Sequence, residues 1–384
     1  MARVMLEARN LSKYFDTPSG KLHAVDNVNF VIHEGETLGL VGESGCGKST
    51  TGRLLLRLIE PTAGEIFFDG KNILDMPKHE FRKERTNMQI VFQDPYASLN
   101  PRMTVSEIIE EPLIINKVMK DSKERARRVE ELMDTVGLSQ RLSYAFPHEL
   151  DGGRRQRIGI ARALSLRPKF IVQDEPVSAL DVSIQAQILN LMDDLQDEFG
   201  LTYLFISHDL SVVKHVSDRI IVMYLGVIVE TASSQELFDR RLHPYTQALL
   251  SALPVPSVDV ETHPIILKGE ISSPINPPKA CRFAGRCMYR QELCDKEEPV
   301  LRELHPGHWV ACHFAENLQQ TDFEDPEELQ KKKAAEVSDE LDTEAADADG
   351  VPDAAREEHE GEDFVPEQAD EIAKGKHDET NISQ

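Results

Sequence analysis

The chain has 384 residues, of which 40% are hydrophobic and 29% are charged, and its formal net charge is −24 at pH 7. Such a chain is long enough for two domains, and it has no apolar run of the roughly 18 residues that span a membrane. The N-terminus lacks an apolar signal core, so we expect a cytoplasmic protein. Residues 315–384 hold 24 acidic and 6 basic residues, which leaves a net charge of only −6 for residues 1–314. This mild charge argues against a nucleic-acid-binding protein of the basic-patch kind.

Residues 3–33 alternate short apolar runs with turn residues, a pattern that predicts an antiparallel β-layer. Tyr14 and Phe15 lie in the first turn of this layer. An aromatic ring at this position can stack on an adenine, because every base has a π-face, although a core or turn aromatic fits the pattern equally well.

The stretch ETLGLVGESGCGKST, at residues 36–50, organises the sequence. Its apolar first part predicts a buried strand, and residues 51–59 have the apolar spacing of a helix. A strand, a glycine-rich G-x-x-x-x-G-K-S loop and a helix, in this order, are typical of a phosphate-binding loop rather than of a chance glycine-rich turn.

The residue types of this loop suit a nucleoside triphosphate. Gly42, Gly45 and Gly47 allow the backbone to curl so that its N–H groups surround an anion at the positive end of the following helix. Lys48 adds a positive charge near the β- and γ-phosphates, and the Ser49 hydroxyl suits a Mg²⁺ ligand. The predicted ATP-binding residues of the loop are Gly42, Glu43, Ser44, Gly45, Cys46, Gly47, Lys48, Ser49 and Thr50.

Two more strands and a helical region follow the phosphate loop. Residues 64–69 and 88–92 are predicted strands, and Gln93 stands where the second of them meets a loop. Gln93 is therefore predicted to help hold Mg²⁺ and a water, although a plain strand-end cap is the alternative interpretation. From residue 104 to residue 166 the apolar spacing is helical, which predicts a helical insertion in an α/β domain.

The last helix of this insertion is predicted from residue 153 onward. Asp151 before it is a good N-cap. Gly152 and Gly153 at its start favour a second anion site, because the first N–H groups of a helix have no partner within it.

Two later strands end in residues that can take part in hydrolysis. The strand at residues 170–172 leads to Asp174 and Glu175. Downstream of a phosphate loop, Asp174 can hold Mg²⁺ through water and Glu175 can polarise a water for attack on the γ-phosphate, although two solvated carboxylates are the alternative interpretation. The strand at residues 202–207 ends at His208, on the ligand side of a parallel sheet, where it can contact the γ-phosphate or orient the water.

In this order the motifs resemble those of the ATPase subunit of an ABC transporter, over residues 4–314. The resemblance implies an α/β phosphate-loop NTPase core with an N-terminal antiparallel β-layer and a helical subdomain. It makes Phe15 the better match for the adenine-stacking aromatic and Tyr14 the second. The residues that resemble Walker A, Q-loop, signature, Walker B, D-loop and H-loop are, in turn, residues 42–50, Gln93, residues 150–154, Asp174 with Glu175, residues 178–181 with Asp181, and His208.

Two stretches near the C-terminal side resemble the oligopeptide/dipeptide importer branch of this family: HPYTQALL at residues 243–250 and SPINPP at residues 273–278. The branch implies two ATP-binding subunits, paralogous or identical, that sandwich two ATP molecules. It also implies two membrane permease subunits, a peripheral place on the cytoplasmic side of the cell membrane, and an indirect link to an extracellular solute-binding protein.

Other functions within the same family stay open. Related importers carry dipeptides, longer peptides, nickel or sugars, so the solute is not fixed by these motifs. A non-transport ABC ATPase is the competing class, but a single set of motifs and the lack of a long heptad run disfavour it. Glu175 and His208 argue against a regulatory subunit that does not hydrolyse ATP.

The signature motif departs from the family pattern. The family normally has Leu-Ser-Gly-Gly-Gln, in which Ser donates to the γ-phosphate held by the other subunit, whereas this chain has Asp151 and Arg154 at the Ser and Gln positions. An ionised carboxylate only accepts hydrogen bonds and repels phosphate, although Arg154 can neutralise Asp151 or contact the phosphate itself. We therefore expect slower hydrolysis at the partner's ATP site, which this signature completes through its residues Asp151, Gly152, Gly153 and Arg154.

Four of the five cysteines, Cys281, Cys287, Cys294 and Cys312, lie within 32 residues. In a cytoplasmic chain such a cluster favours a metal over disulfides, and its gaps are wider than the paired short spacings of zinc ribbons. Subunits of the importer branch can carry a [4Fe–4S] cluster here, so we favour this cofactor over Zn²⁺ and over free or disulfide-linked thiols. The expected role is structural, with a redox role as the alternative.

These observations divide the chain into three parts. An ABC ATPase domain is predicted at residues 1–250, with its helical subdomain at about 95–168, and a cysteine-rich extension is predicted at residues 251–314. The composition of residues 315–384 predicts a disordered, solvating tail, with contact to a basic partner surface as the alternative.

Overall fold

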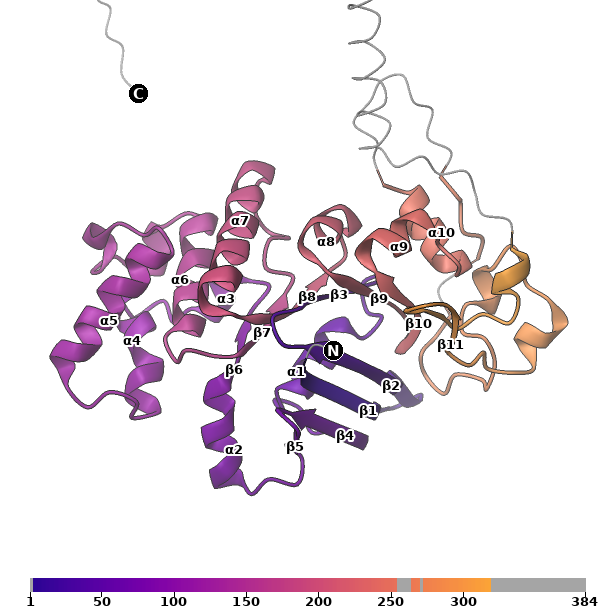
Figure 1. The fold of residues 1–384 in the computed structure, drawn as a ribbon, viewed down its shortest axis with the longest axis horizontal. Helices are drawn as coiled ribbons and strands as arrows, with labels where there is room; N and C mark the ends of the chain where they lie inside the picture. The colour runs from indigo at the N-terminus through magenta and orange to yellow at the C-terminus, as the bar shows by residue number, and fades with distance from the viewer. Residues whose placement is uncertain (1–2, 254–263, 270–271, 319–384) are drawn as a thin grey trace, which may run out of the picture. The chain divides into compact units, whose positions relative to one another are not determined.

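A computed structural model describes residues 3–253, 264–269 and 272–318. Every described residue belongs to one compact unit, Met1–Leu329. Two sheets and the helices around them make up this described part (Figure 1).

The first sheet is the N-terminal layer, with the strand order β2-β1-β4-β5. All its neighbouring strands are antiparallel, so the predicted antiparallel β-layer is confirmed. β1 and β2 pair along their whole length and are therefore longer than the apolar runs that predicted them. The strands are β1 (Val4–Thr17), β2 (Gly20–His33), β4 (Ala63–Phe68) and β5 (Lys71–Asn72).

The second sheet has eight strands, in the order β11-β12-β10-β9-β3-β8-β7-β6. β9, β3, β8, β7 and β6 are parallel, so their carboxyl ends meet at one edge, where ligands bind in sheets of this type. In spatial order the strands are β11 (Arg302–His305), β12 (His308–Val310), β10 (Val227–Ser233), β9 (Arg219–Tyr224), β3 (Thr37–Val41), β8 (Thr202–Ser207), β7 (Phe170–Asp174) and β6 (Met88–Val91).

The central parallel strands are buried on both faces, which explains why their sequences are continuous apolar runs. On one face, Leu38 and Leu40 of β3 belong to a core cluster shared with the first sheet and with α1 (Lys48–Leu55). On the other face, Phe205 of β8 belongs to a second core cluster, shared with the helices. Helix α1 is thus held between the two sheets, as Figure 1 shows.

The predicted helical insertion is present as α4, α5 and α6, which lie together in Figure 1. The helix after the phosphate loop begins at Lys48, earlier than residue 51, and ends at Leu55 because Arg57 has a left-handed φ of 48°. No helix within the described ranges has the length and apolar character needed to cross a membrane. The other helices are α2 (Lys78–Glu84), α3 (Pro95–Ser98), α4 (Val105–Ile115), α5 (Ser122–Thr135), α6 (Gly152–Leu164), α7 (Val182–Phe199), α8 (Leu210–Val216), α9 (Ser234–Asp239) and α10 (Pro244–Ser251).

The described part of the cysteine-rich extension has little regular structure, but β11 and β12 join it to the main sheet through β10. These two strands are short and lack an apolar run, so no sequence pattern predicted them. The tail was predicted to begin at residue 315, but the residues that follow this point are packed. Ala315 is buried in a short turn and Glu316 forms an ion pair with Arg302, so the packed chain continues to about residue 318. The rest of the predicted tail, residues 319–384, lies outside the described residues.

Candidate nucleotide-binding site

The phosphate loop connects β3 to α1 at the carboxyl edge of the parallel strands. Gly42 and Gly47 have φ angles of 152° and 109°, in the region that favours glycine. A Cβ atom at Gly42 would lie 2.2 Å from the carbonyl oxygen of Met223, and one at Gly47 would lie 2.1 Å from that of Ala24. β9 and β2 thus approach the loop so closely that only glycine fits at these two positions.

An open cavity of about 520 Å³ brings together residues that are distant in the sequence. Lys48 and Glu175 both line it, so the phosphate loop and the acidic strand end meet as the proposed chemistry requires. β2 and Pro274 of the extension also line it. The SPINPP stretch around Pro274 carries a resemblance to the importer branch, but no local pattern links residue 274 to the phosphate loop, so its place at the cavity was not predicted. The predicted residues that line the cavity are Phe15, Ser44, Gly45, Gly47, Lys48, Ser49, Thr50, Gln93, Glu175 and His208.

Lys48 holds its positive charge at the wall of this cavity. Its Nζ atom donates to the carbonyl oxygens of Gly42, at 2.6 Å, and Glu43, at 3.0 Å. The side chain is largely enclosed, so the ammonium group is fixed by the loop rather than by solvent. Gly42, Glu43 and Cys46 are predicted loop residues that do not line the cavity.

Ser49 and Asp174 form the candidate magnesium position. The Ser49 hydroxyl donates to Asp174 Oδ1 at 2.6 Å. Burial raises the pKa of Asp174 above its ordinary value, while the bond from Ser49 and the nearby Arg53 oppose this shift. Within the described ranges, no three His, Cys, Asp or Glu side chains are grouped to hold a metal ion. Mg²⁺ at nucleotide sites, however, needs only one or two protein ligands besides phosphates and water, so a hydroxyl beside a carboxylate fits it.

Three polar side chains that line the cavity, Gln93, Glu175 and His208, converge. Glu175 Oε2 accepts a hydrogen bond from Gln93 Nε2 at 2.9 Å and lies 3.2 Å from His208 Nδ1. Glu175 has a left-handed φ of 49°, and its backbone N–H donates to the carbonyl oxygen of Ile206. A carboxylate held at a strained position beside an amide and an imidazole is suited to accept a proton from water.

The two candidate aromatics separate clearly in the structure. Phe15 lines the cavity, with Lys13 Nζ 5.0 Å from its ring centre. Tyr14 instead donates its hydroxyl hydrogen to Asp26 at 2.5 Å and packs against His23, with the ring centres 4.1 Å apart and the rings tilted by 31°. Phe15 is therefore the better-placed ring for an adenine.

The signature residues do not line this cavity. Asp151 caps α6 by accepting from the Arg154 backbone N–H at 2.8 Å, and its other oxygen lies 3.2 Å from the Arg154 guanidinium. The expected neutralising pair is thus formed, on an exposed surface. Gly153 allows α6 to approach α7, because a Cβ there would lie 2.7 Å from Ile184. Gly152 and Asp181 are also outside the cavity, and Asp181 makes no side-chain capping bond to α7.

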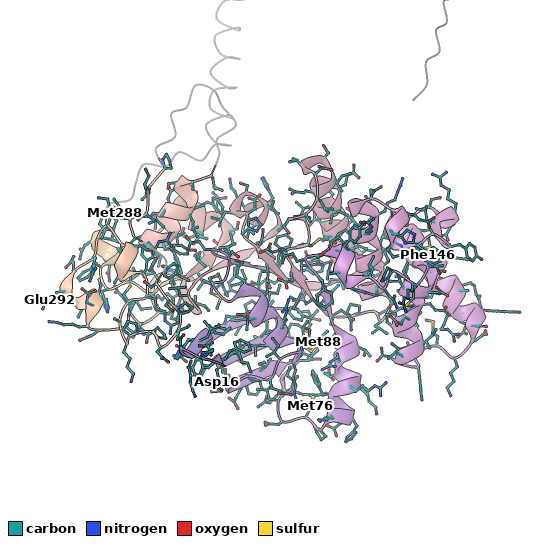
Figure 2. All side chains as sticks on the ribbon, turned by 180° about the vertical axis from the view of Figure 1, so that it is seen from behind. Asp16, Met76, Met88, Phe146, Met288 and Glu292 are labelled. Atoms are coloured by element: carbon teal, nitrogen blue, oxygen red, sulfur yellow. The ribbon has the colours of Figure 1, made fainter. Side chains whose placement is uncertain are left out.

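The four clustered cysteines line a second, smaller cavity in the extension. None of them is in a disulfide. Burial raises the pKa of Cys281 to about 12 and that of Cys287 to about 11. In Figure 2, Met288 of this extension and Phe146, just before the signature, lie far apart across the drawn side chains. The cysteine cavity and the signature surface are therefore separate sites.

Two family models match the chain. One is described as ABC transporter and matches residues 25–178. The other is described as oligopeptide/dipeptide transporter, C-terminal region, and matches residues 229–294.

Curated relatives match along most of the chain. The oligopeptide transport ATP-binding protein AppF of Bacillus subtilis is 54% identical, over 81% of this chain and 97% of the relative. OppF of the same organism is 52% identical, over 82% of this chain and 98% of the relative. A putative peptide import ATP-binding protein of Brucella ovis is 54% identical, over 80% of this chain and 97% of the relative.

Solved structures carry the same fold. The dimeric ATP-binding cassette MJ0796, bound to ADP and Pi, has a TM-score of 0.56 and 33% identity, and the match covers 60% of this chain and 99% of that one. CbiO1 from Clostridium perfringens, part of the transporter complex cbiONQ, has a TM-score of 0.56 and 28% identity, with 62% of this chain and 92% of that one covered. The chain therefore belongs to the ABC transporter ATPases, in the branch that carries the oligopeptide/dipeptide transporter C-terminal region.

Proposed function

We propose that the chain binds and hydrolyses ATP as one subunit of an ABC importer for oligopeptides or dipeptides. The observation that carries this proposal is the single cavity lined by Lys48, Ser49, Gln93, Glu175 and His208. Support for the solute class comes from 54% identity with the oligopeptide transport protein AppF and from the matching C-terminal region.

ATP binding rests on charge and on backbone dipoles. Lys48 and the loop N–H groups bind the phosphates, and Phe15 stacks on the adenine. Ser49 and Asp174, whose side chains are hydrogen-bonded to each other, would hold Mg²⁺, and the ion would neutralise phosphate charge.

Hydrolysis rests on the polar side chains that converge at Glu175. Glu175 takes the proton of the water that attacks the γ-phosphate. Gln93 and His208, which both approach the same oxygen of Glu175, orient this carboxylate and the water. His208 also contacts the γ-phosphate in this proposal.

Transport requires partner subunits, as the names of the related transport proteins imply. We infer that a second ATP-binding subunit, a paralogue or a second copy, faces this one, and that the pair drives two membrane permease subunits from the cytoplasmic side. The exposed Asp151–Arg154 signature would then complete the ATP site of the second subunit.

For the cysteine cavity we favour a [4Fe–4S] cluster that stabilises the extension. Four sulfur atoms around one cavity, without a disulfide, suit a cofactor with several iron atoms. The ultraviolet–visible spectrum of anaerobically purified protein tests this: a coloured protein with about four irons per cluster is expected, and a colourless protein with stoichiometric zinc would exclude it.

The function itself is tested in vesicles that hold the chain with its membrane subunits and their solute-binding protein. Uptake of labelled di- and oligopeptides is expected to require ATP and to stop with Lys48→Ala. ATP-dependent uptake of nickel or a sugar, without peptide uptake, would keep the ATPase role and overturn the solute class.

A further inference from the structure

The extension reaches the phosphate loop from outside the nucleotide cavity. Arg286, from the extension, places one guanidinium nitrogen 3.0 Å and 2.8 Å from the two carboxylate oxygens of Glu43. The two side chains are only 11% and 26% exposed. This pair is therefore partly desolvated, unlike the exposed ion pairs that contribute little.

Every polar group of Glu43 is engaged. Its N–H donates to the hydroxyl of Tyr245 at 2.8 Å, and its carbonyl oxygen accepts from Lys48 at 3.0 Å. Tyr245 is fully buried and packs against Tyr224 and Phe283, with ring distances of 4.7 Å and 5.4 Å. The first residue after Gly42 is thus fixed on three sides, and two of these contacts come from segments more than 200 residues away.

The charge of Glu43 is the reason why this arrangement matters. A carboxylate next to Gly42 in a loop that binds a polyphosphate repels the ligand unless it is neutralised. Its side chain does not line the cavity and turns toward the extension, where Arg286 meets it. Hydrogen bonding to Glu43 raises the pKa of Arg286 above its ordinary value, so the guanidinium stays charged.

We propose that Arg286 is a positioning residue for ATP binding, which acts by neutralising and orienting Glu43 so that the phosphate loop presents Lys48 and its N–H groups to the nucleotide. This proposal rests on the proposed binding of ATP in the adjacent cavity. Arg286 ends a short turn, Ala284–Arg286, between Cys281 and Cys287. The packing of the cysteine segment therefore sets where the guanidinium lies, and the extension is coupled to the nucleotide site.

The test measures ATP affinity with the purified full-length chain by displacement of a fluorescent ATP analogue. Arg286→Leu is expected to raise the ATP Kd about tenfold, a common size for coupling between neighbouring sites. Its effect on turnover in the transporter should appear in KM rather than in kcat. Arg290→Leu is the matched control, because it removes an exposed ion pair with Asp295 in the same segment, and it should leave the Kd within twofold.

A double variant shows whether Arg286 acts by neutralising the charge of Glu43 or only by attaching the extension to the phosphate loop. Adding Glu43→Gln to Arg286→Leu is expected to bring the Kd back to within about threefold of the wild-type value, because the unpaired carboxylate is gone. A double variant as weak as Arg286→Leu alone, or an Arg286→Leu chain that binds ATP normally, would overturn the proposal.

A folding defect is handled by a milder change. If Arg286→Leu lowers the melting temperature strongly, Arg286→Lys keeps the charge and loses the guanidinium geometry, and an intermediate Kd is expected. If the Arg286→Lys variant has the wild-type Kd and an unchanged thermal stability, Arg286 acts through its charge alone. This result would contradict the proposal that its guanidinium orients Glu43. A wild-type chain that binds no ATP would reject the proposed function instead.

Discussion

The phosphate loop and the C-terminal extension are built in opposite ways. The loop is flanked in the sequence by β3 and α1, and its three glycines, Gly42, Gly45 and Gly47, have positive φ. The described part of the extension has little regular structure and is fixed to the core by Arg282–Asp26, Arg286–Glu43 and His308–Glu230, pairs that are 256, 243 and 78 residues apart. A local sequence motif can thus supply the residues that bind the nucleotide, while polar contacts between distant segments fix the extension that packs beside it.

The largest effect is expected from a change at the nucleotide-binding site that leaves the extension intact. Glu175→Gln removes the proposed base, so ATP turnover should fall at least about a hundredfold while ATP binding persists. Steady-state phosphate release from the transporter and nucleotide binding to the purified chain measure the two quantities. Glu130→Gln, an exposed change on α5, is the control and should leave turnover unchanged. If the Glu175→Gln variant keeps its ATP turnover within about tenfold of the wild-type value, another residue must act as the general base.

The second prediction concerns a change in the extension's contact with the core that leaves the nucleotide-binding site intact. Glu230 is fully buried and accepts hydrogen bonds from His308 Nε2 at 2.8 Å and from the backbone N–H groups of Leu242 and His243. Glu230→Ala leaves these donors unpaired, so the free energy of unfolding should fall by about 3–5 kcal/mol. Chemical denaturation followed by the fluorescence of Trp309, the single tryptophan, measures it.

A matched change shows whether burial is the cause. Glu236 also approaches His308, at 3.4 Å from Nδ1, but its side chain is 32% exposed. Glu236→Ala should therefore cost less than about 1 kcal/mol. If the Glu236 and Glu230 variants unfold alike, the buried network is not what anchors β12 to β10.

Sequence patterns predicted the parallel strands and the strand-end residues because continuous apolar runs and the polar groups that follow them are local signals. Gln93, Glu175 and His208 were each recognised as strand ends, and the parallel topology brought them together. Tyr245 and Arg286 carried no such signal. Each contacts the phosphate loop through tertiary packing that no period or spacing encodes, and β12 was too short to show alternation.

The third prediction tests which of the two adjacent aromatic residues, Phe15 or Tyr14, stacks on the adenine. Phe15→Ala should weaken ATP binding about tenfold, since stacking of a base on an aromatic ring contributes about 1–3 kcal/mol. Tyr14→Phe, which removes only the hydroxyl bonded to Asp26, should leave the affinity within twofold. Titration of each purified variant with ATP measures both values. A larger loss with Tyr14→Phe than with Phe15→Ala would reverse the assignment.

The smallest expected effect concerns the signature, which neither region of the comparison contains. Asp151 and Arg154 neutralise each other on an exposed surface, but their pair cannot supply the neutral hydroxyl donor that the family uses. Asp151→Ser with Arg154→Gln should therefore raise turnover at the partner's ATP site by up to about fivefold, the equivalent of one hydrogen bond of about 1 kcal/mol. Arg127→Gln with Glu130→Ser changes the same charges at the same spacing on exposed α5, and it should have no effect. Phosphate release by the assembled transporter measures both pairs of changes, and unchanged turnover with the restored signature would mean that the Asp151–Arg154 pair contacts the partner's phosphate as effectively as serine does.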